Sequence, residues 1–206
     1  MSPPSARSGS GSATDRLILA SASPRRREIL ERLRIGFEAV VPEVEELREG
    51  EPRTVVLENA RRKARAGLEL SGAGVGAVVL GVDTDVVLDR RLLGKAADED
   101  GARERLRALS GRTHEVLSGV VALATSIEAE VPVERSAVAV TEVTFEELDP
   151  ATIELYLESG EWHDRAGAYA IQGLGSILIS SISGDFSNVV GLPVPTLLEL
   201  IPGLRD

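Results

Sequence analysis

The first residues of the chain offer almost nothing to bury, and the sequence becomes apolar only after Arg16. Residues 1–14 are rich in Ser, Gly and Pro, which is typical of a disordered tail. The chain then reads Leu-Ile-Leu-Ala and passes through Ser-Ala-Ser-Pro into a pattern with helical spacing. This predicts a strand that leads into a helix, with Ser23 as the N-cap and Pro24 at the first helical position. We therefore expect a disordered tail over 1–14 and one folded domain over 15–206.

Apolar and polar positions predict further strands and helices in turn. The run Ala77–Leu88 is long and continuously apolar apart from two carboxylates, which indicates a strand buried on both faces. Residues 177–182 and 186–190 flank a Ser-Gly-Asp turn and predict a β-hairpin. The remaining expected elements are strands at 36–41, 116–124 and 136–145, and helices at 54–70, 98–109, 150–159 and 193–200. Because strands alternate with helices while two stretches look antiparallel, the expected fold class is α/β, with a mixed, twisted sheet and flanking helices.

Charge and composition exclude several classes of protein. The 33 acidic and 23 basic residues give a net charge of -10, which argues against a nucleic-acid or membrane partner. No stretch approaches the roughly 18 apolar residues that span a bilayer, and the N-terminus lacks the apolar core of a signal peptide, so a cytoplasmic protein is expected. The absence of cysteine excludes disulfides and thiolate chemistry. Because the net charge is negative, an anionic ligand must be held by local groups.

The segment around the first predicted helix is a candidate phosphate site. Arg25 and Arg26 fall in the first turn of that helix, where the positive end of the helix dipole disfavours cations. A bound anion would remove the conflict, because the hydroxyls of Ser21 and Ser23, the backbone N–H groups and the guanidinium groups all suit phosphate oxygens. The alternative is a solvated turn whose arginines are balanced by acidic residues further along the helix. The residues alone leave both interpretations open.

Two carboxylates interrupt the apolar run Ala77–Leu88. Asp83 and Asp85 point to the same face of the predicted strand because side chains alternate with a period of two. A buried carboxylate is costly unless it is paired or bound to a cation, and paired carboxylates suit Mg²⁺ together with substrate phosphates. The alternative is an edge or a bend of the strand, which one Asp alone would favour.

Other polar residues are less specific. Lys63 shares a helical stripe with small residues and Lys95 follows a predicted hairpin turn, but lone lysines are usually solvated. Gln172 lies in a segment rich in Gly and Ala, where its amide has both a donor and an acceptor for a base edge; close packing with an incidental glutamine is the alternative. His114 and His163 stand in polar, loop-like contexts and suggest structural or surface roles. No dinucleotide fingerprint or Walker-type loop is present.

These segments, taken in order, resemble the Maf family of septum-formation-like nucleotide pyrophosphatases. The resemblance covers residues 16 to about 203. The motifs that carry it are Leu-Ile-Leu-Ala-Ser-Ala-Ser-Pro-Arg-Arg at 17–26, Val-Glu-Glu at 44–46, Lys-Ala at 63–64, Gly-Val-Asp-Thr at 81–84, Gly-Lys at 94–95, Leu-Ser-Gly-Arg-Thr-His at 109–114 and Ala-Gly-Ala-Tyr-Ala-Ile-Gln-Gly at 166–173.

The resemblance implies a fold similar to that of inosine triphosphate pyrophosphatases, with two lobes around a cleft. It implies hydrolysis of nucleoside triphosphates to monophosphate and pyrophosphate with a divalent metal, Mg²⁺ or Mn²⁺, by a homodimer. The pattern ending in Gln172 looks like the branch that acts on dTTP and UTP. The implied roles are phosphate binding by Ser21, Arg25, Arg26, Lys63 and Lys95, metal and water handling by Glu46 and Asp83, and pyrimidine recognition by Thr84 and Gln172. Asp83 is our candidate base and Glu46 mainly a metal ligand, although the sequence does not separate the two roles.

Some positions depart from the family pattern. Ala96 stands where a proline usually follows the Gly-Lys pair, Arg165 replaces a lysine, and Ala170 replaces a glycine. Asp85 replaces an apolar residue, and we hypothesise that it adds a carboxylate on the metal side. Alternative functions are a nucleotide-binding regulator of cell division with incidental hydrolysis, a pyrophosphatase for modified nucleotides such as 7-methyl-GTP, and a nucleic-acid-binding protein, which the acidic charge disfavours.

Overall fold

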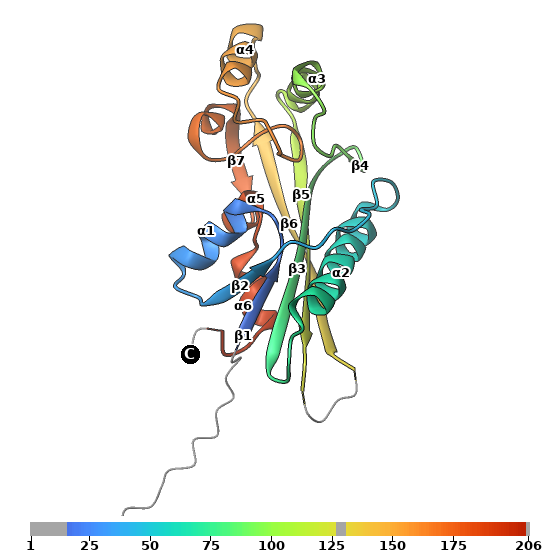
Figure 1. The fold of residues 1–206 in the computed structure, drawn as a ribbon. Helices are drawn as coiled ribbons and strands as arrows, with labels where there is room; N and C mark the ends of the chain where they lie inside the picture. Colours follow the sequence, from blue (N-terminus) through green and yellow to red (C-terminus); the bar gives the residue numbers. More distant parts are fainter. Residues whose placement is uncertain (1–15, 127–130, 205–206) are drawn as a thin grey trace, which may run out of the picture.

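A computed structural model describes residues 16–126 and 131–204, and the tail predicted over 1–14 lies outside this part of the chain. Within the described residues, seven strands form one mixed sheet in the order β2-β1-β3-β5-β6-β7, with β4 paired to β3 (Figure 1). The strands are β1 (Arg16–Ala20), β2 (Phe37–Val40), β3 (Ala77–Leu88), β4 (Arg91–Leu92), β5 (Thr113–Ala124), β6 (Val133–Phe145) and β7 (Ile179–Ser183). The mixed α/β sheet predicted from the sequence is confirmed.

Two kinds of connection produce the mixed sheet. β1 pairs in parallel with both β2 and β3, so the chain must cross over between them, and helices α1 (Pro24–Arg32) and α2 (Pro52–Ser71) form these crossovers. β3, β5, β6 and β7 are joined antiparallel. β3 therefore lies between the two halves of the sheet and is buried along most of its length.

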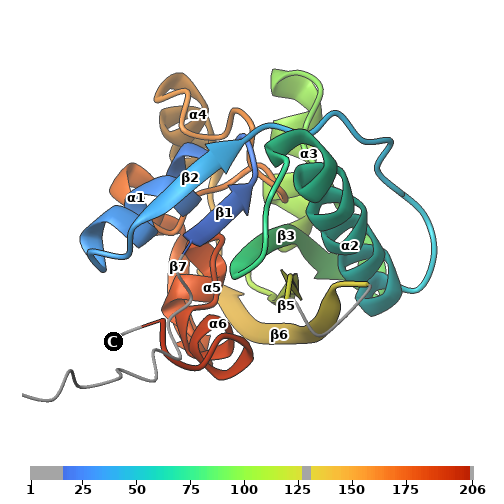
Figure 2. The same ribbon diagram turned by 60° about the horizontal axis from the view of Figure 1, so that its bottom comes forward.

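Helices cover both faces of the sheet (Figure 2). On one face, Ala60 and Ala64 of α2 pack in a fully buried cluster with residues of β1, β3 and β5. On the other face, Leu30 of α1 and Leu197 of α6 (Val194–Leu200) pack against other residues of the same strands. These two layers hold the end of β1 and the middle of β3, and the candidate site residues lie at these two places.

The long strands continue beyond these helices into a second lobe (Figure 1). There, α3 (Glu99–Leu109), α4 (Pro150–Glu158) and the 3-10 helix η1 (Gly173–Leu178) surround the ends of β3, β5 and β6. Leu106, Tyr156 and Trp162 belong to the buried cluster of this lobe. The two lobes therefore share one sheet.

No helix of the described residues has the length and apolarity needed to cross a bilayer.

The hairpin predicted over 177–190 is wrong in its second arm. Residues Phe186–Val190 form helix α5, because the Asp185 carboxylate accepts hydrogen bonds from the backbone N–H and the hydroxyl of Ser187 and so caps a helix start. The Asp185 backbone is also fixed by the hydroxyl of Thr141. A short apolar run is compatible with either a strand or a helix, and here the cap decides.

Candidate functional site

A cleft of about 1430 Å³ lies between the two lobes. One wall comes from the end of β1, the start of α1 and the loop before α2, and the other from residues 92–97 and 163–172. The middle of β3 lies between the walls. All the site residues proposed from the sequence line this cleft: Ser21, Ser23, Arg25, Arg26, Glu46, Lys63, Asp83, Thr84, Lys95 and Gln172.

Arg26 is buried in the cleft wall and organises the phosphate segment. Its guanidinium donates to Ser21 Oγ at 2.9 Å, to the carbonyl of Gly191 at 2.8 Å and to Thr84 Oγ1 at 3.2 Å. These partners are neutral oxygens, and burial lowers the pKa of Arg26. Thr84 Oγ1 also lies 2.7 Å from Ser118 Oγ. A buried guanidinium held only by neutral groups favours an anion nearby.

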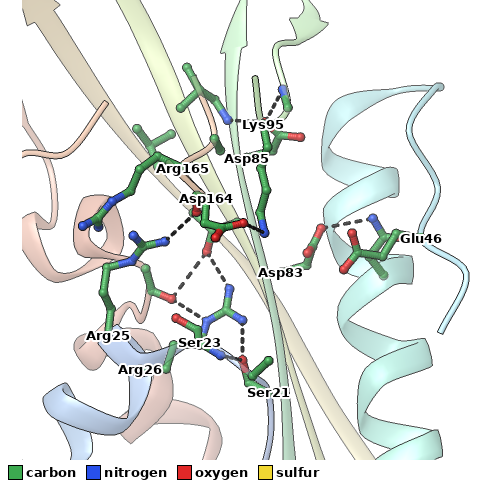
Figure 3. A pocket seen from close by; sticks show the side chains of 18 of the residues that line it. Ser21, Ser23, Arg25, Arg26, Glu46, Asp83, Asp85, Lys95, Asp164 and Arg165 are labelled. Atoms are coloured by element: carbon green, nitrogen blue, oxygen red, sulfur yellow. Dashed lines mark hydrogen bonds and ion pairs between the residues drawn. The ribbon is translucent and has the colours of Figure 1, made fainter. Parts of the chain in front are cut away.

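Arg25, in the first turn of α1, adds a second cation to this wall of the cleft. Burial, followed by the charges of Arg165 and Arg26, lowers the pKa of Arg25 to about 10. Its guanidinium donates to the backbone carbonyl of Asp164 at 3.3 Å, and Figure 3 shows the two residues facing each other across the cleft. The crowding of three guanidinium groups would be relieved by a phosphate. Ser23 is the N-cap residue, as predicted, but its side chain forms no capping hydrogen bond.

Lys63 lies between two carboxylates at the cleft floor. Its Nζ is 2.7 Å from Asp83 Oδ1 and 2.6 Å from Glu46 Oε1. Asn59, one helical turn before Lys63, donates to Asp83 Oδ2 at 3.1 Å and binds both the N–H and the carbonyl of Leu47. Helix α2 thus fixes Asp83 directly and the loop of Glu46 through the backbone of Leu47.

The contact between Lys63 and Asp83 depends on an unusually close approach of α2 to the sheet. A Cβ atom on Gly81 would lie 2.1 Å from the carbonyl oxygen of Ala60, and one on Gly119 would lie 2.3 Å from that of Val56. Such distances are impossible for a side chain, so both strands need glycine where the helix crosses them.

The second carboxylate of β3, Asp85, also lines the cleft, as the predicted strand periodicity required. Its Oδ1 accepts hydrogen bonds from the backbone N–H groups of Val86 at 2.7 Å and Gly94 at 2.9 Å. Burial raises the pKa of Asp85 to about 6. Lys95 follows Gly94, and its Nζ lies 3.4 Å from Asp164 Oδ1.

Gln172 is an exposed residue of the wall in the second lobe. It precedes η1, whose first N–H groups are bound by a single carboxylate: Glu161 accepts from Leu174 at 3.0 Å and from Gly175 at 3.1 Å. The Gln172 side chain caps nothing. Its amide is therefore free to face a ligand while the backbone next to it is fixed.

The two histidines lie outside the candidate chemistry. The polar, loop-like context expected for His114 is wrong, because His114 is a buried residue of β5 whose Nε2 lies 2.8 Å from the Tyr169 hydroxyl. Burial lowers its pKa to about 4. His163 is exposed and stacks on Trp162. Trp162 itself is a packing residue of the second lobe.

Comparison with known proteins identifies the family. The chain matches the family model described as Maf-like protein over residues 16–204. The chain belongs to the Maf family. A protein of Xanthomonas oryzae pv. oryzae (strain MAFF 311018) named dTTP/UTP pyrophosphatase is 48% identical over 188 residues, which are 90% of this chain and 96% of the relative. Proteins of the same name from Bacillus cereus and Thermococcus onnurineus are both 45% identical, covering 89% and 92% of this chain and 93% and 96% of their own lengths.

A comparison with solved structures also found matches, and one of them covers most of the chain. It is a nucleoside-triphosphatase / dITP/XTP pyrophosphatase of Mycobacterium abscessus, with a TM-score of 0.48 and 19% identity, covering 92% of this chain and 96% of its own. Nothing about the function of this Maf chain follows from a likeness of that size.

Sequence patterns do not predict three residues that shape the site: Asn59 and Arg165 line the cleft, and Glu161 fixes the backbone next to Gln172. Asn59 was detectable only as a lone polar residue among the small residues of its helix, and Glu161 only as an acid ahead of a glycine-rich segment. For Arg165, the sequence shows a departure from the family pattern but gives no sign that its charge acts on Arg25. Each acts on residues far away in sequence, and for this reason local patterns gave no sign of it.

The carboxylates of the Maf cleft suit one kind of metal site. In residues 16–126 and 131–204, no group of three or more His, Asp or Glu side chains is placed to hold an ion. Glu46 and Asp83 instead share one cation, the Lys63 ammonium. Mg²⁺ is commonly held by one or two carboxylates together with substrate phosphates. This pair therefore fits an ion that arrives with a nucleotide better than an all-protein metal cage.

Proposed function

We propose that this Maf chain hydrolyses nucleoside triphosphates, chiefly dTTP and UTP, to the monophosphate and pyrophosphate. The observation that carries the proposal is that one cleft holds the buried Arg26, the half-buried Arg25 and the Glu46–Lys63–Asp83 group. Relatives at 45–48% identity over about nine-tenths of the chain are named dTTP/UTP pyrophosphatases, which supports the choice of substrate.

Cationic groups would lower the barrier by neutralising the pyrophosphate that leaves. Arg25, Arg26 and Lys95 converge on the cleft from both lobes, with the hydroxyls of Ser21 and Ser23 beside the arginines. Fixed cations and N–H donors act most strongly where charge develops on the leaving group. Thr84 is bonded to Arg26, so we assign it to the phosphate end of the cleft rather than to base recognition.

Asp83 is the proposed base. Its carboxylate is largely buried, with 13% of the side chain exposed, and Lys63 and Asn59 orient it. In this position it would orient the attacking water and accept its proton. Mg²⁺ or Mn²⁺ bound at Glu46 and Asp83 would supply further neutralisation of phosphate charge. Lys63 would then shift from the carboxylates toward the phosphates.

Gln172 would read the base. Its amide carries two N–H donors and a carbonyl acceptor, and thymine and uracil present both an acceptor and an N–H along one edge. Glu161 fixes the backbone that follows Gln172, which would reduce the entropy lost when the amide binds.

The test is pyrophosphate release from a panel of canonical, modified and methylated nucleoside triphosphates, with Mg²⁺, Mn²⁺ or no metal. We expect metal-dependent turnover of dTTP and UTP, and a loss of about 10²–10⁴-fold in Asp83→Asn, as for removal of a general base. Asp100→Asn is the matched control, because Asp100 is an exposed carboxylate of α3, outside the cleft. A preference for 7-methyl-GTP would contradict the role of Gln172. Binding without turnover of any substrate would favour the regulator of cell division.

The family resemblance also implies a homodimer and a cytoplasmic location, and the acidic charge argues against nucleic-acid binding. These remain predictions. Light scattering coupled to size exclusion would measure the oligomeric state, and a filter-binding assay with duplex DNA at low salt would detect nucleic-acid affinity.

A further inference from the structure

Asp85 connects the strand at the cleft floor to the segment that carries Lys95. Of the two N–H groups bound by its Oδ1, that of Val86 is local, but that of Gly94 lies beyond the β3–β4 hairpin, nine residues further along. The hairpin turns at Asp89 and Arg90, which both have positive φ. The Asp85 carboxylate thus connects the middle of β3, through a hydrogen bond, to the residue Gly94 that follows the β3–β4 hairpin.

The segment 93–95 is held by its backbone. Gly94 has a φ of 59°, and its carbonyl accepts from the N–H of Gly167 at 2.9 Å. Lys95 forms an isolated antiparallel bridge with Ala166. Arg105 donates to the carbonyls of Leu93 and Lys95. Two residues of β3 also bind this segment: the Val86 carbonyl accepts from the N–H of Leu93 at 2.9 Å, and the Asp85 carboxylate is the side-chain anchor that accepts from Gly94.

The side chain of Lys95 is held much less firmly. It is 64% exposed, and its ion-pair partner Asp164 is 89% exposed at 3.4 Å. Exposed ion pairs of this kind contribute only about 0–1 kcal/mol. The position of the ammonium therefore depends on where the backbone of Lys95 is fixed (Figure 3).

We propose that Asp85 is a positioning residue, which binds the N–H of Gly94 and so directs the Lys95 ammonium toward the triphosphate. The proposal rests on the proposed function, because it gives Lys95 a phosphate to meet. It replaces the hypothesis that Asp85 is a metal-side carboxylate. Across the described residues, Asp83, Asp85 and Glu46 do not form a three-carboxylate group suited to an ion, and the bonded oxygen of Asp85 is directed at backbone N–H groups.

The decisive comparison is between Asp85→Asn and Asp85→Val. Asn retains a carbonyl acceptor for both N–H groups and loses the charge, whereas Val has a similar shape and no acceptor. We expect Asn to preserve the KM for dTTP and the dependence on Mg²⁺ concentration. We expect Val to raise the KM about tenfold, the equivalent of one hydrogen bond lost. Equal damage in both variants, together with a shift in the Mg²⁺ concentration for half-maximal rate, would overturn the proposal in favour of a metal ligand.

Double variants test whether the effect passes through Lys95. In a Lys95→Ala background, Asp85→Val should add almost nothing to the rise in KM, whereas in a Lys63→Ala background its tenfold effect should remain. Full additivity with Lys95→Ala would show that Asp85 acts by another route. If the Val variant does not fold, Asp85→Ala serves for the same comparison.

A readout that needs no turnover separates this proposal from the proposed function. Amide hydrogen exchange over residues 93–96 should be faster in Asp85→Val than in the unmodified chain, and unchanged in Asp85→Asn. If the chain hydrolyses nothing, the proposed function fails while the exchange result still reports on the Asp85–Gly94 link. Unchanged exchange in the Val variant would overturn the link itself.

Discussion

The Nζ of Lys63 lies 2.7 Å from Asp83 Oδ1, and this contact joins helix α2 to strand β3 across the floor of the cleft. Both side chains are largely buried, at 14% and 13% exposed. A carboxylate in this position needs a partner, because burial without one would cost several kcal/mol. Lys63, together with Asn59, therefore holds the Asp83 carboxylate in one position at the cleft floor.

Lys63→Met should separate catalysis from folding. We expect kcat for dTTP to fall by about 10²-fold, as when one preorganised electrostatic donor is removed. Arg65→Met is the control, because Arg65 is an exposed residue of the same helix, pairs with Glu134 and does not line the cleft. Steady-state kinetics on both variants, with circular dichroism to confirm folding, would check this. A similar loss in Arg65→Met would show that the effect is structural.

Arg26→Lys should destabilise the protein although the charge is kept. A lysine cannot satisfy Ser21, Gly191 and Thr84 together with the planar geometry of a guanidinium. We expect the free energy of unfolding in urea to fall by about 2 kcal/mol, because at least one buried acceptor is left unpaired. Arg32→Lys, an exposed member of an ion pair with Glu28, should cost less than about 0.5 kcal/mol. Equal costs would contradict the structural role of Arg26.

Gly81→Ala should disturb the site by pushing helix α2, which carries Lys63, away from strand β3. The new methyl group would meet the carbonyl oxygen of Ala60, so α2 must move away from β3 and carry Lys63 with it. We expect a loss of about 1–3 kcal/mol in stability from overpacking, and a fall in kcat at temperatures where the variant is still folded. Gly36→Ala is the control, because nothing lies within 4 Å of a Cβ there. Full activity in folded Gly81→Ala would contradict the idea that close packing of α2 positions Lys63.

His114 should make stability depend on pH. The pKa of His114 is about 4 in the native protein because of burial, against about 6.5 in an unfolded chain. As the pH falls below 6.5 the unfolded chain takes up the proton first, so stability present above that pH is lost progressively toward pH 4. At pH 5 the loss should be about 2 kcal/mol.

Urea unfolding at pH 7 and pH 5 would measure the effect as a difference between the unmodified chain and His114→Gln, in which an amide can still bond to Tyr169. His163→Gln is the matched control, since His163 is exposed. The prediction fails if removing His114 leaves the difference between the two pH values unchanged.

The sequence by itself determined the class of fold and most of the residues in the cleft. The apolar run of β3 predicted a buried strand, and its period of two placed Asp83 and Asp85 on one face. Ser23 and Pro24 predicted the start of α1 correctly. These features are local, because side-chain direction and capping depend on neighbours within a few residues.

Only the tertiary structure decided how these residues meet. Asn59 and Asp83 are 24 positions apart, and Arg25 and Asp164 are 139 apart. Their contacts depend on the register of β3 against β5 and on how closely α2 lies over Gly81 and Gly119. Local periodicity shows which face of an element is buried, but the packing of the whole core selects the partner that each buried polar group finds.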